Sequence, residues 1–206
     1  MAIFIKGILL AVLAYLIGSI STGVILSYYL GQKNLQKEGS GNIGATNVTR
    51  LMGKKWGLLT LVGDTVKGMI PIWLGQWVLE AGSEPYFLTL SVIALSAFLG
   101  HLFPVYLHFK GGKGVATALG IFILLGPKAL LVAIPLFVLV VLWGKYISLG
   151  SISAVLSVPI SLILFNYNIY VVLLSFIMAA AIILKHKENI RRLLKGEEKV
   201  WYNRKG

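Results

Sequence analysis

IFIKGILLAVLAYLIGSISTGVILSYYL, residues 3–30, is an apolar run that carries one charged side chain, Lys6. About 20 apolar residues in a helix are enough to cross the roughly 30 Å of hydrocarbon in a bilayer. The run continues to Leu30 without a convincing small-residue cleavage site, so we read it as a retained first membrane span and not as a signal peptide. This stretch therefore predicts a protein that is built within the membrane.

The composition of the whole chain agrees with that prediction. Of the 206 residues, 57% are hydrophobic, and the mean hydropathy is +0.85. Soluble domains contain about 45–50% apolar residues, so the chain is expected to be an integral membrane protein. It contains no cysteine, which excludes disulfides, thiol catalysis and cysteine-ligated metal.

Six further apolar segments follow the first. The fourth, fifth and sixth of the resulting seven are shorter than the roughly 20 residues of a span, so we expect them to recruit flanking residues or to bend. The sequence thus predicts an all-α integral membrane protein, a bundle of about seven transmembrane helices that forms a single domain over residues 1–206. The six segments cover residues 57–79, 85–107, 115–125, 129–143, 152–165 and 169–184.

Basic residues are distributed unevenly among the gaps between these segments. The formal net charge is +12, and 16 of the 19 lysines and arginines lie in alternate gaps or in the tail from residue 185, whereas Lys128 is the only cation in the opposite gaps. Because positively charged gaps face the cytoplasm, this pattern predicts an N-terminus outside and a C-terminus in the cytoplasm. Cations beside apolar spans favour anionic lipid or a phosphorylated substrate as partners, and we expect no nucleic acid.

The first gap contains the stretch EGSGNIGATNVTR, residues 38–50. Glycines allow successive backbone N–H groups to converge on an anion, and hydroxyl, amide and guanidinium groups can add further donors. A flexible polar loop between helices is an equally good interpretation of such a composition. The side chains that could contribute to an anion site are those of Ser40, Asn42, Thr46, Asn47 and Arg50.

A charge pair lies inside the second apolar segment. Asp64 and Lys67, in GDTVKG at residues 63–68, are one helical turn apart and can neutralise each other. An unpaired charge at that depth costs about 2.5–3.5 kcal/mol or more, and ionisable residues inside spans are candidates for function. Two roles are open: a buried pair that fixes helix packing or holds a basic loop, or direct contact with a substrate.

A second glycine-rich basic stretch, HFKGGKG at residues 108–114, ends one span and opens the next. Its glycines permit close approach of the backbone, and the following VATALG is expected to begin a helix whose N-terminus carries unpaired N–H groups. Together with Lys113 this predicts a phosphate-binding loop. The spacing differs from that of a Walker A motif, so no nucleotide is inferred, but two glycine-rich basic loops on one face strengthen the phosphate interpretation.

Further polar groups lie near the same predicted face. Ser148 or Ser151, at the start of the sixth span, could be an N-cap for that helix or contribute a hydroxyl to a site. His186 and Asn189, three residues apart after the seventh span, share one helical face. A histidine at an interface often snorkels or caps a helix, and a basic tail often anchors to lipid. A base or donor role requires His186 to lean over the glycine-rich loops.

These stretches together resemble the motifs of the bacterial acyl-phosphate-dependent glycerol-3-phosphate acyltransferases, the PlsY family. The resemblance covers essentially the whole chain. It implies a seven-helix bundle in the bacterial cytoplasmic (inner) membrane, with the active site facing the cytoplasm. The matching stretches are SGNIGATNVTR at residues 40–50, GDTVKG at 63–68, GHLFPVYLHFKGGKGVATALG at 100–120 and KHKENIRRLLKGEE at 185–198.

The resemblance further implies a reaction and the residues that carry it. A fatty acyl group passes from acyl phosphate to the 1-hydroxyl of sn-glycerol 3-phosphate, giving lysophosphatidic acid and inorganic phosphate, with no cofactor, metal, covalent acyl-enzyme or obligate protein partner expected. Glu198 is implied to be structural. Catalytic roles are implied for Ser40, Arg50, Lys113, His186 and Asn189, and substrate binding for Gly41, Asn42, Ala45, Thr46, Asn47, Lys110, Gly111, Gly112, Gly114 and Ser151.

Two questions stay open at this level. The proton of the attacking hydroxyl could be accepted by the substrate phosphate or by His186. A transporter of an organic phosphate would also use basic loops and broken spans, but it predicts inverted repeats and polar groups at the midplane of paired spans. For the enzyme, we expect Ser40 and Arg50 to affect turnover far more than Lys33 and Lys37 in the same loop.

Overall fold

The computed structural model describes residues 2–31, 34–82 and 85–201, and within these ranges the chain forms helices and no strand. The all-α prediction is confirmed. The chain divides into two compact units, the first ending at Leu125 and the second beginning at Gly126. Each unit is described by itself below.

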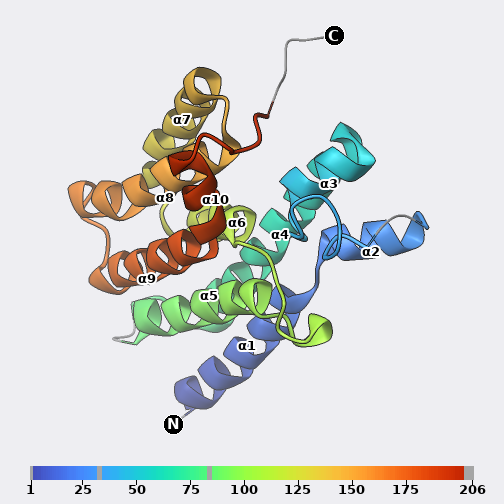
Figure 1. The fold of residues 1–206 in the computed structure, drawn as a ribbon. Coiled ribbons are helices and arrows are strands. Elements are labelled where there is room, and N and C mark those ends of the chain that lie inside the picture. The colour runs from blue at the N-terminus through green and yellow to red at the C-terminus, as the bar shows by residue number, and fades with distance from the viewer. Residues whose placement is uncertain (1, 32–33, 83–84, 202–206) are drawn as a thin grey trace. The chain divides into compact units, whose positions relative to one another are not determined.

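The first unit contains the first four predicted apolar segments, and each of them is helical (Figure 1). One further helix, α3, begins within the stretch 38–50, where the sequence predicts a loop, and ends just beyond it. The helices are α1 (Ala2–Ser19), α2 (Thr22–Tyr29), α3 (Ala45–Met52), α4 (Lys54–Val78), α5 (Tyr86–Leu102), the short 3-10 helix η1 (Val105–Leu107) and α6 (Val115–Leu125).

The first apolar run is a broken helix. Its two parts, α1 and α2, meet at an angle of 42°, because the chain leaves helical geometry at Ile20 and Ser21. The Ser21 hydroxyl accepts a hydrogen bond from the backbone N–H of Val24 at 3.4 Å, and a serine in this position favours the start of a new helix. The predicted first span therefore contains an internal helix start.

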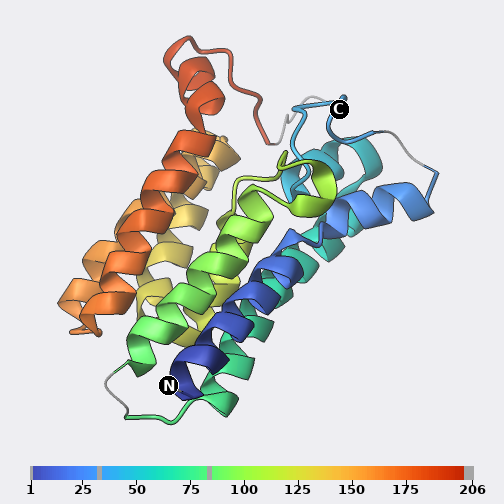
Figure 2. The same cartoon turned by 90° about the horizontal axis from the view of Figure 1, so that it is seen from below.

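Glycines bring helices of the first unit into close contact. A Cβ atom at Gly18 would meet the backbone of Ala97, and one at Gly100 would meet the backbone of α1. Figure 2 shows the result, with α1 in dark blue running beside α5 in green. A Cβ at Gly120 of α6 would likewise meet the Thr65 carbonyl of α4. Small residues of this kind let helix backbones approach closely in a membrane.

Helix α6 is short for a predicted membrane span. It has 11 residues, which at 1.5 Å per residue gives a length of about 16 Å, roughly half of the hydrocarbon thickness. Of the two outcomes expected for this segment, recruitment of flanking residues does not occur, since the helix has the predicted bounds. The residues before Val115 form the glycine-rich loop, and Pro127, just after Leu125, already opens the next helix.

The second unit consists of α7 (Pro127–Gly144), α8 (Ile147–Leu164), α9 (Ile169–Lys185) and α10 (Lys187–Leu194). Helices α7 and α8 have recruited flanking residues, as predicted, and reach 18 residues each. A Cβ at Gly150 would meet side chains of α7, so these two helices pack closely. Helices α9 and α10 meet at a 58° bend, and Figure 2 shows α10, in red, turned away from the end of α9.

The helices have the lengths and surfaces of a membrane protein. Among the described residues, four helices are long and apolar enough to cross a bilayer, and the number rises to six if each bent pair forms one span. Large apolar side chains remain exposed on them, for example Leu131 at 73% and Leu184 at 72%. Such side chains suit a surface that faces lipid.

Candidate active site

One buried side chain shapes the loop that carries the first motif. Asn47, only 1% exposed, accepts a hydrogen bond from the backbone N–H of Ser40 through Oδ1 at 2.9 Å. Its Nδ2 donates to the carbonyl groups of Leu35 at 3.2 Å and Glu38 at 3.1 Å. A single amide therefore holds three backbone groups, which fixes the path of the loop against α3.

The second half of the first motif is helical. The Asn42 side chain accepts a hydrogen bond from the backbone N–H of Gly44 at 2.8 Å, a turn that ends the loop and precedes the start of α3. Ser40 in the loop and Arg50 in the last turn of α3 are both exposed, so both can meet a ligand. Of the other predicted binding residues here, Gly41 is exposed and Asn42, Ala45 and Thr46 are half-buried.

The glycine-rich loop after α5 is folded back on the end of that helix. Gly112 donates its backbone N–H to the carbonyl of His101 at 3.1 Å. Gly114 has a φ of +87°, a left-handed conformation that glycine adopts without steric cost. Helix α6 begins immediately after it at Val115, as the sequence predicts.

A hydrogen bond joins the two glycine-rich loops. Gln36, which precedes the first motif, donates its side-chain N–H to the carbonyl of Lys110 at 2.9 Å. Within the first unit the two loops are therefore in contact. Lys110 and Arg50 are exposed and Lys113 is half-buried, so the glycine-rich loop after α5 and helix α3 carry the cationic groups that an anionic ligand needs.

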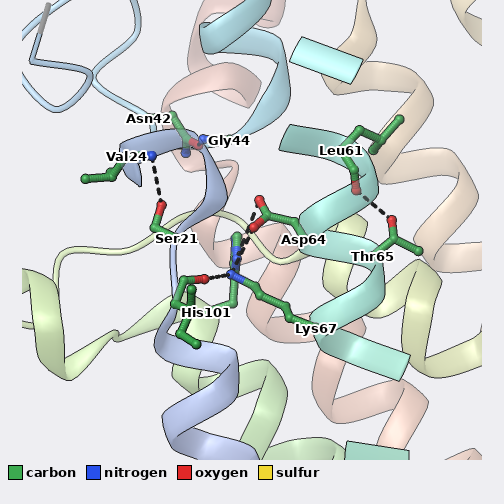
Figure 3. Close-up of polar contacts among 10 residues, drawn as sticks. Ser21, Val24, Asn42, Gly44, Leu61, Asp64, Thr65, Lys67 and His101 are labelled. Atoms are coloured by element: carbon green, nitrogen blue, oxygen red, sulfur yellow. Dashed lines mark hydrogen bonds and ion pairs between the residues drawn. The ribbon is translucent and has the colours of Figure 1, made fainter. Parts of the chain in front are cut away.

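Asp64 and Lys67 form the predicted charge pair inside α4 (Figure 3). Lys67 Nζ lies 3.0 Å from Asp64 Oδ1, and both residues are buried. Lys67 also donates a hydrogen bond to the carbonyl of Ile20 at 2.6 Å, and His101 Nδ1 lies 4.0 Å from Asp64 Oδ2. The pair therefore contacts the break between α1 and α2 and the end of α5, which favours the packing role over direct substrate contact.

In the second unit, the carboxylate of Glu198 gathers the third motif. Its Oε1 accepts hydrogen bonds from Ser148 Oγ and Asn189 Nδ2, each at 2.7 Å. Its Oε2 accepts a hydrogen bond from Arg192 Nε, also at 2.7 Å. The segment after α10 is therefore tied to α10 and to the first turn of α8, in keeping with the structural role that the resemblance implies for Glu198.

Neither serine at the start of α8 is an N-cap. The helix begins at Ile147, before the predicted start at residue 152, and no described side chain caps it. Ser148 lies in its first turn and bonds to Glu198, while Ser151 Oγ donates to the carbonyl of Ile147 at 2.9 Å. The N-cap interpretation is wrong because the helix extends past both serines, which brings it closer to the length of a membrane span.

His186 stands at the junction of α9 and α10 and is 3% exposed. Its Nδ1 lies 2.8 Å from the carbonyl oxygen of Ile182, and because a carbonyl only accepts hydrogen bonds, we assign a proton to Nδ1. In the neutral imidazole, Nε2 is then the basic nitrogen. Asn189, in the first turn of α10, is buried as well.

The pKa of Glu198 follows from these contacts. Burial raises the pKa of the carboxyl group, but hydrogen bonds from Asn189, Ser148 and Arg192, together with the charge of Arg192, lower it more, and the result lies below the ordinary value of 4.5. Because the pKa is lower in the folded state, the ionised carboxylate stabilises the fold fully above that ordinary value. This stabilisation is lost as the pH falls through the folded pKa.

Glu198→Gln should lower the free energy of unfolding by about 1.5–3 kcal/mol at neutral pH, because hydrogen bonds to a charged group are replaced by weaker neutral ones. The difference from wild type should shrink once the pH falls below the ordinary carboxyl pKa of 4.5 and through the lower folded pKa. Thermal unfolding in detergent measures both effects. Glu197→Gln, at the exposed neighbouring position, is the matched control. A loss of equal size at every pH would rule out a role for the ionised carboxylate.

Sequence reasoning missed two contributors to the site. Gln36 carries no chemical signature, and only the fold shows that its amide reaches Lys110. His101 was visible as a histidine at the end of a span, but its partner Asp64 belongs to a different span. A histidine in the last turn of a span that leads to a glycine-rich loop was the available signal.

The fold and these loops together define a class: a multi-pass membrane protein with cationic, glycine-rich loops suited to phosphate groups. The family model for glycerol-3-phosphate acyltransferase matches residues 8–196. The chain belongs to this family of acyltransferases.

Individual relatives cover nearly the whole chain. A glycerol-3-phosphate acyltransferase of Syntrophotalea carbinolica is 46% identical over 90% of this chain and 92% of its own, and one of Aquifex aeolicus is 42% identical over 94% and 98%. The crystal structure of PlsY, an integral membrane glycerol 3-phosphate acyltransferase, in its glycerol 3-phosphate form matches with a TM-score of 0.88, 39% identity and 95% coverage of both chains. Its lysophosphatidic acid form matches with a TM-score of 0.86.

Proposed function

We propose that the protein transfers a fatty acyl group from acyl phosphate to the 1-hydroxyl of sn-glycerol 3-phosphate, forming lysophosphatidic acid and inorganic phosphate. The match to PlsY, at 39% identity over 95% of the chain, carries this proposal. The two matching PlsY structures are a glycerol 3-phosphate form and a lysophosphatidic acid form. Lysophosphatidic acid is glycerol 3-phosphate with one acyl group added, so the two ligands correspond to the substrate and the product of the proposed transfer.

The enzyme lies in the bacterial inner membrane with its N-terminus outside and its C-terminus in the cytoplasm. The distribution of lysines and arginines among the gaps supports this orientation. Both glycine-rich loops, α10 and the tail then face the cytoplasm. Glycerol 3-phosphate reaches them from water, and the acyl chain approaches from the bilayer.

Each catalytic side chain has a distinct task in this proposal. Arg50 and Lys113 neutralise the phosphate groups, and Ser40 adds a hydroxyl donor from the loop that Asn47 shapes. His186 and Asn189, which lie in the second unit, are proposed to act in the same reaction, and Glu198 orients the Asn189 amide. The residues proposed to line the site are Gly41, Asn42, Ala45, Thr46, Lys110, Gly111, Gly112, Gly114 and Ser151.

The chemistry needs positioning more than activation, because acyl phosphate is already an activated mixed anhydride. The hydroxyl oxygen of glycerol 3-phosphate attacks the acyl carbonyl carbon, and the carbonyl electron pair moves to oxygen. The C–O bond to phosphate then breaks, and inorganic phosphate leaves. Cations and N–H groups stabilise the oxyanion and the leaving phosphate. No acyl-enzyme forms, and the hydroxyl proton passes to His186 Nε2 or to a substrate phosphate.

His186→Ala is expected to lower kcat by about 100-fold, because a general base contributes about 10²–10⁴ to the rate. His186→Asn, which keeps a donor for the Ile182 carbonyl but has no basic nitrogen, should be equally slow. Phosphate release from purified acyl phosphate in the presence of glycerol 3-phosphate measures the rate. Near-normal turnover of either variant would remove His186 from proton transfer and assign the proton to the substrate phosphate.

The function itself is tested with detergent-purified protein, palmitoyl phosphate and radiolabelled glycerol 3-phosphate, without CoA or added metal. Labelled lysophosphatidic acid is the expected product. If product appeared only with palmitoyl-CoA, the proposed donor would be wrong. If neither donor gave product, acyl transfer would be wrong, and uptake of labelled glycerol 3-phosphate into proteoliposomes would then test the transporter alternative.

A further inference from the structure

Three ionisable side chains lie buried together in the first unit, and the proposed reaction uses none of them. They are Asp64, Lys67 and His101, which are 2%, 5% and 4% exposed. Desolvation of such groups within a membrane protein costs free energy that their mutual contacts must offset. What they touch is informative, because Lys67 and His101 each reach irregular backbone outside the cluster.

Lys67 supports the break in the first span. Its ammonium group lies 3.0 Å from Asp64 Oδ1, as Figure 3 shows. It also donates a hydrogen bond to the carbonyl oxygen of Ile20 at 2.6 Å. Ile20 lies between α1 and α2, where the helical hydrogen-bond pattern is interrupted. Backbone polar groups at membrane depth need partners inside the protein, and Lys67 supplies one. Asp64 neutralises the positive charge that Lys67 brings to this contact.

His101 lies between Asp64 and the glycine-rich loop. On one side of its ring, Nδ1 is 4.0 Å from Asp64 Oδ2. On the other side the backbone of Gly112 rests against the ring, so closely that a Cβ at Gly112 would overlap Nε2. The His101 carbonyl also accepts the Gly112 N–H at 3.1 Å. A Cβ at Gly111 would meet that carbonyl as well, so two successive glycines pack on this one residue.

We propose that Asp64, Lys67 and His101 act as positioning residues that fix the glycine-rich loop, residues 110–114, and through it the geometry of phosphate binding. The cluster connects four elements of the first unit: the α1–α2 break, α4, the end of α5 and the loop. Asp64 faces the imidazole across 4.0 Å, and the imidazole sets the position of Gly112, which packs against it. The identity of the ligand as a phosphorylated substrate rests on the function proposed above. The positioning of the loop by the cluster is independent of that function.

The first test compares His101→Ala with a matched destabilising control. Leu90, also fully buried on α5, lies about 16 Å along that helix from His101, and Leu90→Ala should destabilise the bundle without touching the loop. We expect His101→Ala to speed amide hydrogen exchange across residues 110–114 about tenfold, and Asp64→Asn to act in the same direction. Leu90→Ala should lower the thermal midpoint and leave exchange in the loop unchanged.

Kinetics give the second readout. His101→Ala should raise the KM of at least one phosphorylated substrate by about tenfold, with a smaller change in kcat, because the loop that binds phosphate is misplaced and the reacting groups are not removed. Leu90→Ala should leave both KM values near those of wild type. Gly112→Ala should raise the same KM that His101→Ala raises, because its Cβ overlaps the ring.

The double variant His101→Ala/Gly112→Ala supplies the decisive comparison. Removing the ring makes room for the new methyl group, so the double variant should be no worse than the more damaging single one. Fully additive losses would overturn the proposal, as would unchanged exchange in residues 110–114 of His101→Ala. If wild type forms no lysophosphatidic acid, the proposed function fails, and the exchange measurements still decide whether the cluster positions the loop.

Discussion

Gly114→Ala is expected to lower acyl transfer by about 100-fold or more, since misplacement of binding groups by about 1 Å can have an effect of that size. A φ of +87° costs a residue with a Cβ roughly 1–2 kcal/mol. The Cβ would also overlap the ring of Phe98 and lie 2.7 Å from Leu102 Cδ1. Both of these side chains are at most 1% exposed, and a close-packed core resists their displacement. The loop must shift instead, and Lys113 shifts with it.

Gly82→Ala is the matched control for this variant. Gly82 has nearly the same backbone conformation, with a φ of +89°, but no described atom lies within 4 Å of the position that its Cβ would take. It should therefore show the roughly 1–2 kcal/mol of backbone strain alone and near-normal turnover. Steady-state rates and thermal midpoints of the two variants separate strain from steric overlap. Equal losses of activity would show that loop displacement is not the cause.

Hydropathy was enough to predict the helical segments but not their irregularities. Apolar runs long enough to span a bilayer leave the chain almost no alternative to a helix, since every backbone polar group in lipid must be paired. The Ile20 carbonyl at the break is paired with a lysine 47 positions later in the chain, and no local pattern reveals such a partner. Helix α3 was missed because glycine and asparagine in EGSGNIGATNVTR suggest a loop, whereas the Asn42 turn starts a helix.

Residue types at the site were predictable, and their orientations were not. Ser40, Asn42, Asn47 and Arg50 were all candidates for one anion site because each can donate hydrogen bonds. The structure separates them: Asn47 is buried and bonded to the loop backbone, whereas Ser40 and Arg50 are exposed. Whether such a side chain points inward or toward solvent depends on how the loop packs against α3 and α4. Long-range partners such as Gln36 and Lys110 also come from the fold alone.

Alanine at Ser40 or Arg50 should reduce kcat/KM by about 100-fold, the size of effect that loss of one preorganised donor produces. Alanine at Lys37 should change it by less than about twofold, since a solvated lysine contributes little. All three residues are exposed, so exposure does not distinguish them. What distinguishes them is how the backbone of each is held: Asn47 accepts a hydrogen bond from the Ser40 backbone N–H at 2.9 Å, and Arg50 belongs to a helix. Lys33, grouped with Lys37 in the sequence analysis, lies outside the described residues.

The dependence of activity on ionic strength distinguishes a site with oriented groups from a surface that is only basic. Attraction by solvated charges is screened over about 10 Å at 0.1 M salt, so a variant that loses only such attraction should resemble wild type once salt is high. The deficits of Ser40→Ala and Arg50→Ala should persist there. Arg50→Lys should recover little activity, because lysine keeps the charge but lacks the planar fork that binds phosphate through two hydrogen bonds. Equal, salt-sensitive losses at Ser40, Arg50 and Lys37 would instead make the loop a basic surface without a specific site.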